Sequence, residues 1–73
     1  MTRYGVVLFY TNSSVMRTEK LLMKAGYSIK LIPTPREFSS DCGMALRFDW
    51  ADYEQVKLIL DTAHLEIGAI HQM

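Results

Sequence analysis

The stretch that decides how this chain folds covers residues 33–43 and reads Pro33-Thr34-Pro35-Arg36-Glu37-Phe38-Ser39-Ser40-Asp41-Cys42-Gly43. It contains both prolines and the single cysteine of the chain. Polar connections of this length are uncommon inside small domains, and those that occur often carry function. We therefore take it as the boundary between two halves of the fold and as the first place to look for a site.

The half before this boundary has the pattern strand–helix–strand. Residues 5–10 are continuously apolar, β-branched or aromatic, which is typical of a buried strand. Asn12 or Ser13 is expected to cap the following helix, and Gly26 is expected at the position just after its end, where a positive φ is usual. Alternation of apolar and polar side chains over residues 27–32 predicts a second strand that ends at Pro33.

The half after the boundary repeats this pattern. Met44, Leu46 and Phe48 alternate with polar or small residues, which predicts a half-buried strand. Asp52 and Gln55 have the spacing of a capping box at the start of a second helix. The last strand is expected over residues 65–70.

This order, β-α-β-β-α-β, predicts an α+β protein with the ferredoxin-like split β-α-β architecture, in one domain over residues 1–73. That architecture is a four-stranded antiparallel sheet with two helices on one face. It places the 33–43 connection at the same end as the start of helix one and as His64 at the end of helix two. The face without helices is expected to be covered by a second copy of the chain, forming a homodimer.

Composition narrows the possible partners. Eight basic and eight acidic residues give a formal net charge of zero, which argues against nucleic acid because phosphate binding needs concentrated positive charge. The apolar run at residues 5–10 is too short to span a membrane. One cysteine cannot form an internal disulfide, so a cytoplasmic location is expected.

Cys42 is the candidate catalytic residue. A thiol becomes nucleophilic when a cation, a helix N-terminus or a histidine lowers its pKa, and the expected topology offers Arg36, helix one and His64. The alternative is that Cys42 simply packs as a small apolar residue. His64 also has a structural role as a cation near a helix C-terminus, and His71 is expected to be solvated.

The other candidates are ligand-binding residues of the same stretch: Arg36, Ser39, Ser40, Gly43 and Thr34. The Arg36 guanidinium suits carboxylates and phosphates, and the serines can donate hydrogen bonds to an anion. Cys42, His64 and His71 are too few for a metal site. No glycine-rich phosphate loop is present, and no cofactor is expected.

Several of these residues together resemble a bacterial domain family of unknown activity that is described as selenium/sulfur carrier-like. The specific part is the run Pro35-Arg36, Ser39-Ser40-Asp41-Cys42-Gly43 and Ala45-Leu46-Arg47-Phe48; the helical matches, such as Glu19-Lys20-Leu21-Leu22, are less specific. The resemblance implies that Cys42 holds sulfur or selenium as a persulfide-type adduct, in a pocket shaped by Arg36, Ser39, Ser40 and Gly43. It also implies donor and acceptor proteins as partners.

Three hypotheses follow. The first is a sulfur or selenium carrier that uses Cys42 as acceptor; it is a carrier more than an enzyme, because no general acid–base pair is evident. The second is a non-catalytic binding module that grips an anionic metabolite through Arg36. The third is an oligomeric interaction protein in which neither residue matters.

Overall fold

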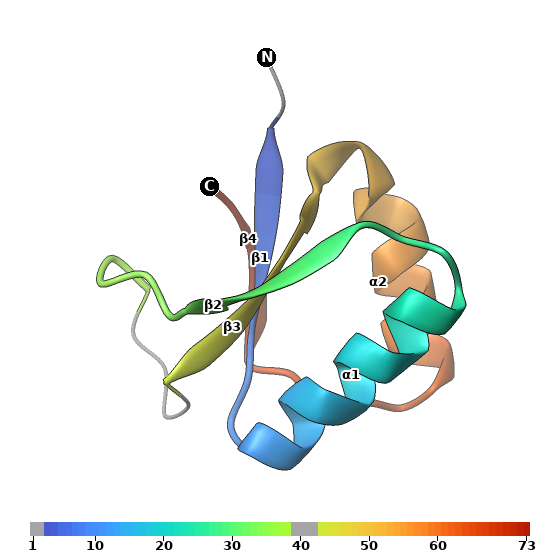
Figure 1. The fold of residues 1–73 in the computed structure, drawn as a ribbon, viewed down its shortest axis with the longest axis horizontal. Helices are drawn as coiled ribbons and strands as arrows, with labels where there is room; N and C mark the ends of the chain where they lie inside the picture. The colour runs from blue at the N-terminus through green and yellow to red at the C-terminus, as the bar shows by residue number, and fades with distance from the viewer. Residues whose placement is uncertain (1–2, 39–42) are drawn as a thin grey trace.

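The computed structural model describes residues 3–38 and 43–73, and shows one sheet with two helices on one side of it (Figure 1). The elements, in chain order, are β1 (Tyr4–Leu8), α1 (Asn12–Lys24), β2 (Ile29–Pro33), β3 (Met44–Asp49), a short 3-10 helix (Trp50–Asp52), α2 (Tyr53–Thr62) and β4 (Ala69–Gln72). The predicted α+β class, with a four-stranded antiparallel sheet and two helices, is confirmed.

The strands lie in the order β2-β3-β1-β4, so the two strands that follow the helices are not neighbours. All three pairings are antiparallel. Leu8 of β1 faces Ala45 of β3 on one side and Ala69 of β4 on the other. The end of β1, the start of β3 and the start of β4 therefore lie at one end of the sheet, together with the boundary stretch.

Helix α1 begins one residue earlier than the sequence indicated. The N-cap is Thr11, not Asn12 or Ser13: its backbone is extended, with φ −138° and ψ 154°, and its side-chain oxygen accepts a hydrogen bond from the Ser14 backbone N–H at 3.2 Å. The prediction at the other end is confirmed, because Gly26 follows the C-cap with φ 90°.

The capping box predicted for helix α2 is wrong. Asp52 stands at the N-cap but makes no capping hydrogen bond with its side chain. The chain instead enters through the 3-10 helix, whose cap is Asp49; the Asp49 side chain accepts from the Ala51 N–H at 3.2 Å. In the described part of the chain, neither helix is long and apolar enough to cross a membrane.

The last strand also differs from the prediction. It covers Ala69–Gln72 rather than residues 65–70, because the chain first closes α2 in a tight C-terminal turn. In that turn His64 takes the left-handed conformation, with φ 55°, and the Leu65 N–H donates to the Leu60 carbonyl. After α1, the Tyr27 N–H donates to the Leu22 carbonyl in the equivalent way. His64 therefore occupies after α2 the position that Gly26 occupies after α1.

The main core lies between the helices and the sheet. It is made of fully or almost fully buried side chains from both layers: Val7, Phe9, Val15, Leu22, Leu46, Phe48, Val56 and Leu60. This matches the apolar periodicity of the strands and helices. The sheet face without helices, which we call the open face, carries a second buried cluster of Val6, Leu8 and Ala45.

Candidate functional site

The boundary stretch connects β2 to β3, and the structure describes only part of it. Ser39, Ser40 and Cys42 lie outside the described residues, so their predicted roles stay predictions. The described part consists of residues 34–38 and Gly43. Figure 1 shows residues 34–38 on the side of the sheet away from α1 and α2.

A backbone hydrogen bond joins the two ends of this connection. The Thr34 N–H donates to the Gly43 carbonyl at 3.0 Å, which continues the β2–β3 ladder beyond the Pro33–Met44 pair. A Cβ added to Gly43 would meet no other described atom within 4 Å. Crowding by the described residues therefore does not require a glycine at this position, and a ligand that approaches Gly43 would have free space.

Arg36 and Glu37 occupy the corner of a turn. The Phe38 N–H donates to the Pro35 carbonyl at 3.0 Å and closes it, and both charged side chains are exposed. Within the described residues, Arg36 makes no ion pair. Its guanidinium is thus accessible to an anionic partner, as the sequence predicted for this residue type.

The turn brings Phe38 onto the open face of the sheet. The rings of Phe38 and His71 are stacked, with centroids 4.4 Å apart and an interplanar angle of 4°. Phe38 also packs against the buried cluster of Val6, Leu8 and Ala45. Because β2 and β4 are the two edges of the sheet, the connection reaches from one edge to the other.

His71 is exposed, as the sequence predicted, although it lies within β4 and stacks on Phe38. Because the last strand was predicted at residues 65–70, His71 was placed in a tail beyond it, and its contact with Phe38 was not predicted. The described part of the connection thus meets His71, whereas the sequence had offered His64 as the nearby histidine. The predicted proximity of Cys42 to residues 12–14 and to His64 lies outside the described residues.

Positively charged or ionisable side chains form a row across the open face. Lys30 of β2 faces Arg47 of β3, Arg47 faces Val6 of β1, and Val6 faces His71 of β4. Lys30 and Arg47 are like charges directly opposite each other, an arrangement that destabilises a sheet unless something compensates it. From the sequence, Lys30 and Arg47 were polar positions of alternating strands, and Arg47 was also part of the run that resembles the family. The pairing of β2 with β3 brings the two residues together.

The described residues contain no group of three or more histidine, cysteine or acidic side chains that could hold a metal ion. The ionisable side chains that the structure places on or against the described part of the connection are Arg36, Glu37 and His71.

The chain is similar to a known protein family. The sequence matches the family described as "Putative Se/S carrier protein-like" over residues 4–72, which includes both halves of the fold and the boundary stretch. No curated protein and no solved structure matches it significantly.

Proposed function

Since the chain belongs to the Se/S carrier protein-like family, we propose that it carries sulfur or selenium between partner proteins on the side chain of Cys42. The family match is the observation that carries this proposal. The geometry supports it in one respect: the connection that contains Cys42 is attached to the sheet both at its base, between Thr34 and Gly43, and through Phe38.

The proposed transfer is a thiol–persulfide exchange. The Cys42 thiolate attacks the outer sulfur of a donor persulfide; the new bond joins Cys42 Sγ to that sulfur, and the S–S bond of the donor breaks. The donor leaves as a thiolate, so there is no net oxidation. The same exchange in reverse, onto the thiolate of an acceptor protein, returns Cys42 to its thiolate form.

In this proposal the other residues of the connection bind the charged adduct. Arg36 is exposed and makes no ion pair within the described residues, so it can approach an anionic persulfide. Ser39, Ser40, Gly43 and Thr34 supply hydrogen-bond donors. We expect the pKa of the Cys42 thiol to lie below its ordinary value of ~8.5, because the thiolate is the reactive form.

The test is the pH dependence of Cys42 alkylation in the folded protein, followed by incubation with glutathione persulfide and intact-mass measurement. We expect a titration midpoint below ~8.5, together with a mass gain of one sulfur atom that the Cys42→Ser variant lacks. Arg36→Gln should raise the midpoint. Arg17→Gln, which removes an equally exposed charge from α1, should leave it unchanged.

Alkylation that occurs only after unfolding would contradict the carrier function. In that case the binding module becomes the better description, and ligand-dependent stabilisation abolished by Arg36→Gln is its signature.

Two further assignments belong to this proposal. The ferredoxin-like classification is supported by the β-α-β-β-α-β order and by antiparallel pairing of all neighbouring strands.

A homodimer through the open face would bury the row of Lys30, Arg47 and His71 against the same row of the second copy. Sedimentation at low and high salt tests it, because like charges across such an interface make association stronger at high salt.

A further inference from the structure

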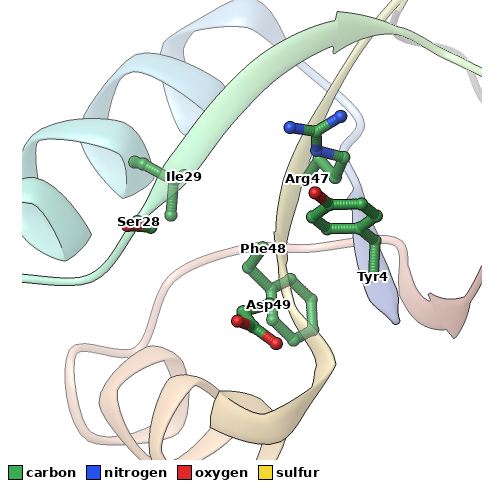
Figure 2. Close-up of a pocket in the computed structure, with 6 residues that line it drawn as sticks. All are labelled: Tyr4, Ser28, Ile29, Arg47, Phe48 and Asp49. Atoms are coloured by element: carbon green, nitrogen blue, oxygen red, sulfur yellow. The ribbon is translucent and has the colours of Figure 1, made fainter. Parts of the chain in front are cut away.

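A hollow lies at the end of the sheet opposite to the boundary stretch. Its volume is ≈ 270 Å³, and it is lined by Tyr4, Ser28, Ile29, Arg47, Phe48 and Asp49 (Figure 2). Ile29 faces Phe48 at the start of β2, four residues before the Pro33–Met44 pair that precedes the boundary stretch. At the rise of a β-strand this separation is about 13 Å, so the hollow is a different place from the site proposed above.

The cation of the hollow is held by an aromatic ring. The guanidinium carbon of Arg47 lies 4.1 Å from the centroid of the Tyr4 ring, a cation–π contact that orients the side chain. Within the described residues, Arg47 makes no ion pair, although Lys30 on the neighbouring strand repels it. Its planar set of N–H donors is therefore positioned and still available to a carboxylate.

The acidic group of the hollow, the Asp49 carboxylate, has a hydrogen-bond partner of its own. Asp49 lies two residues from Arg47 on the same strand, and one of its oxygens, Oδ1, accepts from the Ala51 N–H. Among the described residues, the Asp49 carboxylate makes no ion pair with Arg47 or any other cation. Figure 2 shows that the two charged groups do not point toward each other. The second carboxylate oxygen is thus available to an ammonium group.

The remaining lining gives the hollow an apolar part. Ile29 is half-buried and offers apolar surface, whereas Phe48 is 1% exposed and belongs to the core behind the hollow. Ser28 and Tyr4 add hydroxyl groups. A hollow with one fixed cation, one fixed anion and an accessible Ile29 side chain matches a small zwitterion with an apolar substituent. A volume of ≈ 270 Å³ is below the range typical of drug-sized ligands.

From these observations we propose that the hollow binds a free α-amino acid. The carboxylate of the ligand pairs with Arg47, its ammonium group pairs with Asp49, and its side chain packs on the half-buried Ile29. This binding is independent of the carrier function, because none of these residues belongs to the stretch that contains Cys42.

The first experiment screens each of the twenty common amino acids against the folded protein by ¹⁵N-¹H NMR titration at millimolar concentration. We expect saturable shifts at Ser28, Ile29 and residues 47–49 for at least one of them. The N-acetyl derivative and the decarboxylated amine of the best ligand each lose one charged contact, and each should bind at least about tenfold more weakly. If no amino acid binds, or if the N-acetyl derivative binds equally well, the proposal is wrong.

The second experiment uses variants. Asp49→Asn removes the charge but keeps an acceptor for the Ala51 N–H, and Arg47→Gln removes the guanidinium; each should weaken binding at least about tenfold. The matched controls are Glu66→Gln and Arg17→Gln, which remove exposed charges elsewhere and should not change affinity. Should Arg47→Gln fail to fold, Arg47→Lys keeps the charge without the planar fork and should still weaken binding. Unchanged affinity in Asp49→Asn and in either Arg47 variant would refute the proposal.

Discussion

Both faces of the sheet contain completely buried side chains, but these are covered in different ways. On the face covered by helices, Val7, Leu46 and Phe48 are sealed by two helices. On the open face, Val6 and Ala45 are also completely buried, although no helix covers them. On the open face, neighbouring side chains and Phe38 from the boundary stretch cover these residues. Complete burial in a small sheet therefore does not require a second layer of secondary structure.

The two faces also differ in the kinds of side chain that they carry. The covered face is apolar and tightly filled, and Thr18 is the only polar side chain among the described residues that is fully buried there. The open face combines a small apolar cluster with Lys30, Arg47, His71 and Tyr4. We expect substitutions on the covered face to act through volume, and those on the open face to act through individual contacts.

The largest expected effect tests the filling of the covered face. Gly5 leaves no room for a side chain, because an added Cβ would overlap the Phe48 ring and lie 2.6 Å from Cε3 of Trp50. Phe48 is 1% exposed and cannot move outward. We expect Gly5→Ala to lower the free energy of unfolding by roughly 3 kcal/mol, the upper end of typical overpacking costs, as measured by urea denaturation. Gly43→Ala, where the added Cβ would have free space among the described residues, is the control and should change stability little.

A smaller effect is expected from removing the cover of the open face. Phe38→Ala deletes the stack on His71 and exposes part of the Val6 cluster, so we expect a loss of about 1–2 kcal/mol in unfolding free energy. Tyr10→Ala removes an aromatic ring that is 54% exposed and should cost clearly less. Equal losses in the two variants would mean that the ring of Phe38 does not contribute as a cover.

The smallest effect tests Thr18, the fully buried polar side chain of the covered layer among the described residues. The Thr18 hydroxyl is buried and has no hydrogen-bond partner in the described structure. Replacing it by a methyl group of similar size in Thr18→Val removes an uncompensated polar group, and we expect stabilisation by about 1 kcal/mol. Thr18→Ser keeps the hydroxyl and loses a methyl group, so it should be destabilising. A destabilised Thr18→Val protein would show that the hydroxyl is satisfied in solution.

The local pattern of the sequence was sufficient for much of the fold. Alternating residues 44–49 identified β3, and Gly26 marked the end of α1. Errors occurred where two local signals compete. Four consecutive capping residues at positions 11–14 left the start of α1 ambiguous, and His64 gives no sign in the sequence of its left-handed conformation.

For the candidate sites, too, some features follow from the sequence and others only from the tertiary structure. The sequence by itself determined the element order and the fold class, and it made the stretch that contains Cys42 the candidate site, because periodicity, turn residues and a family motif are properties of neighbouring positions. Only the tertiary structure decided that Phe38 reaches His71, that Gly5 must stay free of a side chain, and that Arg47 lies over Tyr4. Each of these depends on which strands become neighbours and in what register, and that is set by the packing of the whole sheet rather than by any local pattern.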